Sequence, residues 1–385
     1  MLWTWTARTG NSPAPPPPGV RSPPLPCTAL DLANFTLILT TGLIVDARLD
    51  VRKLEDTITV LVKRKFPRAG ARIALRNGVY EFQVPEEFGG DMPAVRFTAE
   101  HHVEAYRSDA SRPQLPMDMP GLSTSSPTIS KVPDLDEYFR SPGPTTIKDW
   151  IECKSPLLHI HVCVFEDLTF IGVTSPHAGF DVGTGILLDA WTRLINGADL
   201  DEIAGMNWDS EPFKRFAPVH SPLAVPKLVP RGLFDLPLFS QIRWVTQKLW
   251  NEFWDPEDVH VFVRVPKAFL ADWKCQIMDQ LKREGSTEWV GSSDILLAWW
   301  YKETLGHRAN NETPMHIFIV ANVRNKPIFS NLSDSESIKQ YICNAVSFIP
   351  VPPFPTSTFN SESVGQLALR LRRAINAYNA NPAGI

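Results

Sequence analysis

The chain has 385 residues, of which 43% are hydrophobic and 21% are charged, and its formal net charge is −4 at pH 7. These values are those of an ordinary soluble globular protein, and the length predicts two domains of roughly 150 to 200 residues each. Because the charge is negative and no basic stripe is present, nucleic acid is not expected as a partner. The five cysteines show no metal-ligand spacing, which predicts reduced thiols in a cytosolic protein.

The N-terminal part of the chain shows neither a secretory signal nor a membrane span. Residues 1–26 form a proline-rich leader, expected to resemble polyproline II where the prolines cluster. The longest apolar segment, 35–45, is shorter than the roughly 20 residues that a membrane span requires, so it is predicted to be a central strand. We therefore expect a cytoplasmic protein without a membrane span.

Helix and strand patterns alternate along the rest of the chain. Apolar residues at helical spacing predict helices at 49–66, at 186–194, from 267, at 292–305 and at 364–378. Apolar runs and alternating apolar residues predict strands at 157–165, 168–173, 260–265 and 317–323. Asn77-Gly78 predicts a hairpin at 74–84. Residues 107–147 are predicted to be a surface excursion and 205–240 a proline-rich loop. The alternation predicts an α/β (α+β layer) fold.

The most distinctive segment runs from Phe170 to Trp191, with His177 and Asp181 at its centre. An apolar run before it predicts a buried strand, and a Gly-rich turn after it leads into an apolar helix. This layout would hold a neutral imidazole at the end of a rigid strand, where it could take a proton from a substrate hydroxyl. Histidine suits this role because its free pKa, about 6.5, lies near physiological pH.

The surroundings of this motif resemble the BAHD acyltransferases, which carry an HxxxD motif and transfer an acyl group from coenzyme A to an alcohol or amine. The resemblance covers most of the chain and is closest to the fungal, secondary-metabolite branch. It is carried by segments at 24–32, 49–85, 155–181, 292–306, 317–330 and 341–350.

The resemblance implies two chloramphenicol-acetyltransferase-like domains with the active site at their interface. The N-terminal domain is expected at 27–204, a crossover linker at 205–258 and the C-terminal domain at 259–385. BAHD enzymes usually end near a DFGWG segment; this chain contains none, so the second domain is expected to be incomplete. A monomer is the family-like expectation.

The resemblance also implies the chemistry and the roles of the residues. His177 acts as general base on a hydroxyl or amine acceptor, which attacks the thioester of acyl-CoA, the co-substrate, without an acyl-enzyme. The expected reaction is acetyl transfer from acetyl-CoA to a secondary metabolite such as a terpenoid, alkaloid or polyketide. Asp181 is structural: it turns away from the pocket and forms an ion pair with Arg324, which fixes the loop that carries His177. Residues that bind coenzyme A are not identified.

Two other interpretations remain open. A peptide-synthetase condensation domain would use HHxxxDG, but Pro176 and Val182 replace its first His and its Gly. A truncated, non-catalytic binding module (a pseudoenzyme) is the alternative outside enzymes. Covalent catalysis has no support, because the chain lacks a GxSxG elbow and its cysteines lack an adjacent base.

Other features have structural interpretations. His159 and His161 have a spacing that could ligate zinc, but without a third ligand nearby structural histidines are predicted, and no metal is expected. His101-His102 has no partner motif. Asn344 follows Cys343 where the family usually has a Gly-Asn pair. The tryptophans at 244, 250 and 254 are predicted to pack the crossover onto the core.

Overall fold

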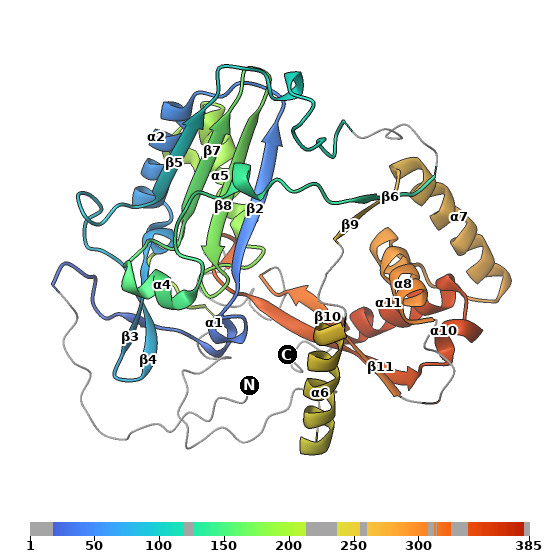
Figure 1. Cartoon of the computed structure of the whole chain (residues 1–385). Helices are drawn as coiled ribbons and strands as arrows, with labels where there is room; N and C mark the ends of the chain where they lie inside the picture. The colour runs from blue at the N-terminus through green and yellow to red at the C-terminus, as the bar shows by residue number, and fades with distance from the viewer. Residues whose placement is uncertain are drawn as a thin grey trace. The chain divides into compact units, whose positions relative to one another are not determined.

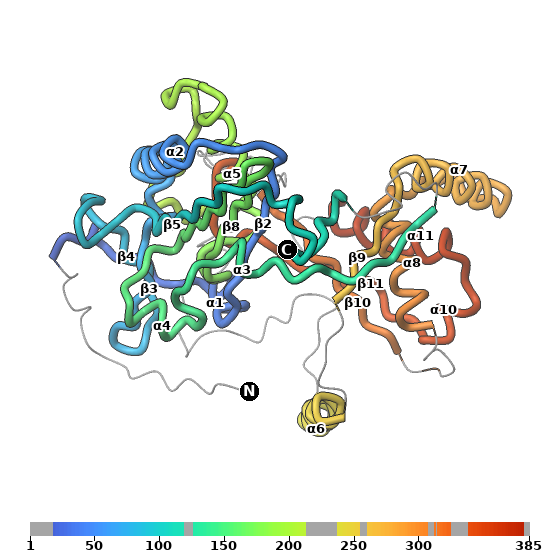
Figure 2. Tube along the Cα trace, turned by 45° about the horizontal axis from the view of Figure 1, so that its top comes forward, coloured from blue at the N-terminus to red at the C-terminus, as the bar shows by residue number. Residues whose placement is uncertain are grey.

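The computed structural model describes residues 18–118, 126–212, 237–254, 260–306, 312, 314–324 and 338–380. The chain divides into two compact units (Figure 1; Figure 2). Unit 1 contains residues 1–113, 134–226 and 322–346, and unit 2 contains residues 114–133, 227–321 and 347–385. Parts of the predicted leader (1–17) and crossover (213–236 and 255–259) lie outside the described residues. The linear domain boundaries stay a prediction.

The centre of unit 1 is a four-stranded sheet in the order β2-β8-β7-β5. Its strands are β2 (Ile38–Val45), β5 (Arg96–His101), β7 (His159–Val164) and β8 (Thr169–Pro176). The pairs β2–β8 and β7–β8 are antiparallel, whereas β5 and β7 run parallel. Every residue of β7 and β8 is buried, as expected for the middle strands of a covered sheet. The three strands predicted at 35–45, 157–165 and 168–173 are thus confirmed.

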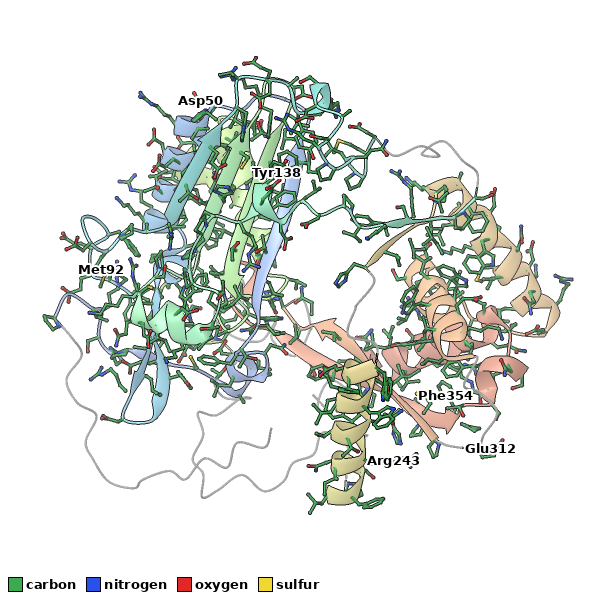
Figure 3. The ribbon with its side chains drawn as sticks, in the orientation of Figure 1. Asp50, Met92, Tyr138, Arg243, Glu312 and Phe354 are labelled. Carbon is green, nitrogen blue, oxygen red and sulfur yellow. The ribbon has the colours of Figure 1, made fainter. Side chains whose placement is uncertain are left out.

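Helices α2 (Val51–Arg64) and α5 (Thr184–Ile195) lie on the same face of this sheet (Figure 1). Helix α2 begins where the Asp50 side chain, labelled in Figure 3, accepts hydrogen bonds from the amides of Arg52 and Lys53. It ends before Pro67, as predicted. Its buried residues join the apolar side chains of β7 in one hydrophobic core: Leu54, Ile58, Leu61, Val62, Ile160, Val162 and Val164.

A hairpin extends from unit 1 where the sequence predicted one. Strands β3 (Arg72–Arg76) and β4 (Val79–Gln83) pair antiparallel, and β1 (Leu25–Pro26) pairs with β4. Asn77 and Gly78 both have positive φ, 51° and 80°. Positive φ at both central residues is the requirement of a type I′ turn, which is why Asn-Gly predicts it.

The segment 107–147 has more regular structure than the predicted surface excursion. It contains β6 (Thr128–Lys131), which pairs antiparallel with β9 (Val261–Arg264), and α3 (Asp136–Phe139), which packs on β7 and β8. The backbone of Phe139 lies so close to Gly172 of β8 that a Cβ there would collide with it. Neither element has a buried residue, in agreement with a surface segment. The two elements were not predicted because a short edge strand and a single helical turn leave little periodicity in a sequence.

Unit 2 is built from helices around a separate hydrophobic core. Its main elements are α7 (Lys267–Arg283), α8 (Ser292–Leu305), α11 (Val364–Ala380) and the paired strands β10 (Pro314–Asn322) and β11 (Val346–Pro355). The predicted helices at 267, 292–305 and 364–378 and the strands at 260–265 and 317–323 are confirmed. The remaining short elements of the two units are α1 (Ala29–Ala33), η1 (Pro67–Gly70), η2 (Tyr106–Ser108), α4 (Ile147–Glu152), η3 (Leu200–Glu202) and α10 (Thr358–Ser361).

Helix α6 (Leu238–Trp254) corrects one prediction, because none of its residues is buried. Trp244, Trp250 and Trp254 are 61%, 65% and 66% exposed, so within the described ranges they do not pack onto a core. An apolar pattern identifies a helix face that water disfavours, but it does not identify what covers that face. Across the described parts of the chain, no helix combines the length and the hydrophobicity needed to cross a membrane.

Candidate active site

His177 directly follows the last residue of β8, and hydrogen bonds fix its backbone on both sides. Its N–H donates to the carbonyl of Leu37 (2.8 Å), and its carbonyl accepts from Nδ2 of Asn344 (3.0 Å). The side chain is half-buried. The imidazole therefore lies at the end of a rigid strand, where the sequence predicted it.

The two ring nitrogens of His177 have different surroundings. Nδ1 is buried and has no hydrogen-bond partner among the residues that the structure describes. Nε2 is not a buried atom, and it makes no hydrogen bond with any residue that the structure describes. Only Nε2 is therefore placed to exchange a proton with a molecule outside the protein.

Asp181 and Arg324 form the ion pair that the resemblance implied, and the two side chains are only 3% and 2% exposed. Both guanidinium Nη atoms donate to the carboxylate, with 3.2 Å from Nη1 to Oδ2. The carboxylate also accepts from the amides of Gly183 and Ala345, each at 2.8 Å. Asp181 thus connects the segment after His177 with the segment 322–346 of the same unit.

The other donors of Arg324 are also paired. Nε donates to the carbonyl of Tyr341 (2.6 Å), Nη2 donates to the carbonyl of Cys343, and Nη1 donates to Oδ1 of Asn322 (3.2 Å). A planar guanidinium suits such a position because its donors are rigidly oriented. Both carboxylate oxygens of Asp181 accept hydrogen bonds from Arg324 and from backbone amides, which fits a structural role for this acid.

Asn344 also contacts the segment that carries His177. Its Nδ2 lies 3.0 Å from the carbonyl of His177, 2.9 Å from that of Ala178 and 3.1 Å from Oδ1 of Asp31. Asp31 is held by the N–H and the hydroxyl of Thr28, both at 2.8 Å. The sequence pointed to Asn344 through a family motif that is altered here. Asp31 lies in the segment 24–32 that carries part of the resemblance, but no role was predicted for it.

A buried arginine balances the charge of Asp31. Burial raises the pKa of Asp31, and the positive charge of Arg68 acts in the opposite direction. Arg68 is fully buried, donates to the carbonyl of Ser210 (3.0 Å) and lies over the ring of Phe82. This cation therefore favours the carboxylate form of Asp31, which accepts the hydrogen bond from Asn344.

Gly183 and Gly185, which follow Asp181, differ in their need for a small side chain. A Cβ on Gly183 would collide with the carbonyl of Ile342 and with the guanidinium of Arg324, whereas a Cβ on Gly185 would meet nothing within 4 Å. Gly183 is thus required by close packing around the ion pair, whereas Gly185 lies in the first turn of α5 and has room for a side chain.

The buried cysteines are unsuited to covalent catalysis. Burial raises the pKa of Cys163 and of Cys343 to about 12, and it also raises the pKa of Cys27 well above its usual value. A thiol is a nucleophile only as its thiolate, so these three are unreactive near neutral pH.

His159 and His161 have the hydrogen bonds expected of structural histidines. Nε2 of His159 lies 2.7 Å from the hydroxyl of Ser155, and its ring stacks on Trp150. Burial lowers the pKa of His159 to about 3, so it is neutral at physiological pH. Nδ1 of His161 lies 2.8 Å from the hydroxyl of Thr98.

Comparison with known proteins gives the following matches. No family model matches the chain. An acetyltransferase from Pyricularia grisea (pyiB) is 28% identical over 374 residues, which cover 91% of this chain and 69% of that protein. The solved structure of TRI101 from F. sporotrichioides, complexed with coenzyme A and T-2, aligns with a TM-score of 0.59 and 14% identity over 94% of this chain and 75% of that one. Vinorine synthase aligns with a TM-score of 0.56 and 17% identity over 94% and 72%.

TRI101 and vinorine synthase are BAHD acyltransferases with two chloramphenicol-acetyltransferase-like domains. The structural matches show the fold, and the sequence match to an acetyltransferase shows the enzyme class. The chain is an acyltransferase with the fold of the BAHD enzymes. His177 and Asp181 of this chain have the spacing of an HxxxD motif.

Proposed function

We propose that this acyltransferase uses acetyl-CoA and acetylates a hydroxyl of a secondary metabolite such as a terpenoid, alkaloid or polyketide, with His177 as general base. The observation that carries the proposal is the position of His177: its backbone is fixed at the end of β8, and only its Nε2 is open to a substrate. The relative pyiB is named an acetyltransferase, and PaAT-2 from Phomopsis amygdali, 24% identical over 360 residues, is named an O-acetyltransferase. TRI101 was solved with coenzyme A, which supports acyl-CoA as the co-substrate here.

In the proposed mechanism, Nε2 of His177 takes the proton of the acceptor hydroxyl as its oxygen attacks the thioester carbonyl. The tetrahedral intermediate collapses, the carbon–sulfur bond breaks, and the coenzyme A thiolate leaves and receives a proton from the imidazolium. A positioned general base is typically worth about 10²- to 10⁴-fold in rate. No acyl-enzyme forms, in agreement with the protonated state of the buried thiols.

In this proposal Asp181 and Arg324 act as positioning residues. Their ion pair holds the loop after His177, and neither side chain reaches the substrate. Asn344 has a similar task, because it holds the carbonyls of His177 and Ala178. Positioning of this kind matters because reacting atoms must lie about 3 to 3.5 Å apart in line.

The proposal is tested by incubating the purified chain with acetyl-CoA and a panel of alcohols while release of free thiol is followed. Thiol release that depends on the alcohol, and an acetylated product in mass spectrometry, are expected. Transfer only from an acylated carrier protein would favour a condensation-type enzyme. Binding of alcohol or acetyl-CoA without turnover would favour a non-catalytic binding module.

The compartment and the oligomeric state belong to the same proposal. We propose a cytoplasmic monomer, and size-exclusion chromatography with light scattering tests the monomer. A mass twice that of the chain would overturn it.

A further inference from the structure

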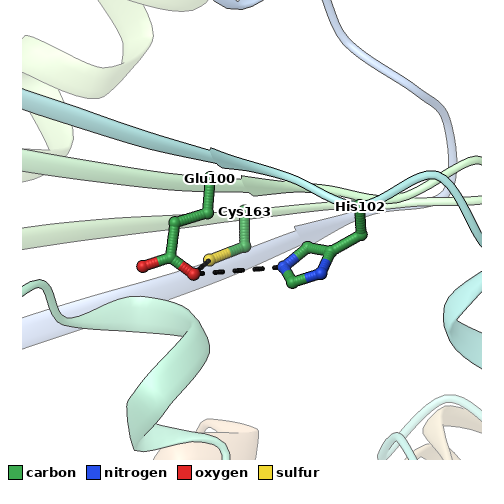
Figure 4. Close-up of side chains that lie close together, drawn as sticks. All are labelled: Glu100, His102 and Cys163. Carbon is green, nitrogen blue, oxygen red and sulfur yellow. Dashed lines mark hydrogen bonds and ion pairs between the residues drawn. The ribbon is translucent and has the colours of Figure 1, made fainter.

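Three potential metal ligands meet on the sheet of unit 1, away from His177. Oε2 of Glu100 lies 4.0 Å from Nε2 of His102 and 4.0 Å from Sγ of Cys163. The ligand atoms of these three residues all lie within 4.8 Å of one another. Figure 4 shows the three side chains pointing toward one another.

The strand register brings these residues together. In the parallel pair β5–β7, Glu100 lies opposite Cys163 and Thr98 lies opposite His161. Since side chains alternate along a strand, His102 shares the face of Glu100, and His161 shares the face of Cys163. The other face of β7 packs into the hydrophobic core, so this polar cluster faces away from α2 and α5.

His161 lies beside these three residues, and its Nε2 faces them. This atom is 3.2 Å from Sγ of Cys163 and 3.9 Å from Oε1 of Glu100. The hydroxyl of Thr98 lies 2.8 Å from Nδ1 of His161. In the tautomer with the proton on Nδ1, this nitrogen donates to Thr98, the lone pair is on Nε2, toward Cys163, and Thr98 holds the ring as outer-shell partners of metal ligands do.

A separate observation points to a missing ligand. Nε2 of His102 is buried and makes no hydrogen bond within the described residues. The ring is held in place by stacking on Phe165, with 4.1 Å between centroids and 3° between planes. A buried nitrogen without a hydrogen-bond partner among the described residues, 4.0 Å from a carboxylate oxygen, is placed where it could ligate a cation.

We propose that Glu100, His102, His161 and Cys163 form a zinc site that ties the edge strand β5 to β7. Thiolate, imidazole and carboxylate are the ligands that structural Zn²⁺ takes. Tetrahedral Zn²⁺ at its usual bond lengths places neighbouring ligand atoms about 3.3 to 3.6 Å apart. Four of the six distances between these ligand atoms are 3.2 to 4.0 Å, close to that spacing, and a rotation of His102 toward Cys163 and His161 would close the site.

An ion can reach this cluster from the protein surface. The Glu100 side chain is 55% exposed, whereas that of His161 is 4% exposed. The carboxylate therefore lies at the solvent-exposed end of the cluster, and the imidazole and thiol ligands lie deeper in the protein. His161 and His159 also line a cavity of about 470 Å³ formed with residues 140–145 and Thr174. Binding at Cys163 would transfer the thiol proton to solvent as the Zn–S bond forms.

The test uses the full chain with any affinity tag removed, after treatment with a chelator. Zn²⁺ is titrated against a chromophoric competitor, and Co²⁺ is added separately as a spectroscopic probe. One equivalent of Zn²⁺ should bind, and Co²⁺ should give tetrahedral d–d bands with a thiolate charge-transfer band. The variants Cys163→Ser and His102→Ala should weaken Zn²⁺ binding more than about 100-fold, and Thr98→Val about 10- to 100-fold.

The matched control is His101→Ala, which removes the adjacent, exposed histidine and should leave Zn²⁺ affinity unchanged. If Cys163→Ser does not fold, Glu100→Gln at the solvent-exposed end of the cluster replaces it, with circular dichroism to verify folding. The proposal is overturned if the unaltered chain binds no stoichiometric Zn²⁺, or if His101→Ala weakens binding as much as His102→Ala. Because the readout is metal binding, failure of the proposed acetyl transfer would not affect it.

Discussion

Replacement of Asp181 by alanine should destabilise unit 1 strongly. The substitution leaves the guanidinium of Arg324, 2% exposed, without its counter-charge, and breaking such a buried pair typically costs about 3 to 5 kcal/mol. It also removes the acceptor of the amides of Gly183 and Ala345, each hydrogen bond being worth about 1 kcal/mol. We expect a loss of about 4 kcal/mol or more, a large fraction of the roughly 5 to 15 kcal/mol that stabilises a typical protein.

The assay is urea unfolding followed by circular dichroism and tryptophan fluorescence. The matched control is Asp189→Ala, which removes an exposed aspartate from α5, a few residues further along the same chain segment. This control should change the unfolding free energy by less than about 0.5 kcal/mol. A loss below about 1 kcal/mol for Asp181→Ala, or equal losses in the two variants, would refute the reasoning.

Three further predictions follow from the same region. Asn344→Ala should lower kcat more than KM rises, because the carbonyls of His177 and the next residue lose their donor; an unchanged kcat would contradict this. Gly183→Ala should lower the melting temperature, whereas Gly185→Ala should leave it nearly unchanged; equal melting temperatures would refute the packing argument. The folded pKa of His159 is about 3, below its unfolded value of about 6.5, so the stability it contributes is present above pH 6.5 and is lost as the pH falls toward 3. With a chelator present, His159→Gln should reduce this pH dependence of the unfolding free energy. An unchanged pH profile would contradict the prediction.

Much of the fold could be predicted because its signals are local. Asn77-Gly78 requires only the conformations of two residues, and helix α8 begins and ends at the predicted residues 292 and 305. The apolar run of β8 needed no partner to be recognised as a strand. The ion pair between Asp181 and Arg324, which are far apart in sequence, was predicted through the family resemblance and not from spacing.

What could not be predicted depends on which strands and segments meet in space. Glu100 and Cys163 approach each other only because β5 and β7 pair in parallel, and nothing in either segment encodes that register. The zinc site proposed at His161 depends on this register and not on spacing along the chain. Asn344 likewise acquires its role through packing against Ala178 and Asp31.

The most direct measurement compares His177→Ala with the unaltered chain in the thiol-release assay with acetyl-CoA and an accepted alcohol. The account predicts a rate about 10² to 10⁴ times lower, with an unchanged melting temperature, because the half-buried ring supplies a base and little packing. A variant that folds normally and keeps its rate would contradict the account.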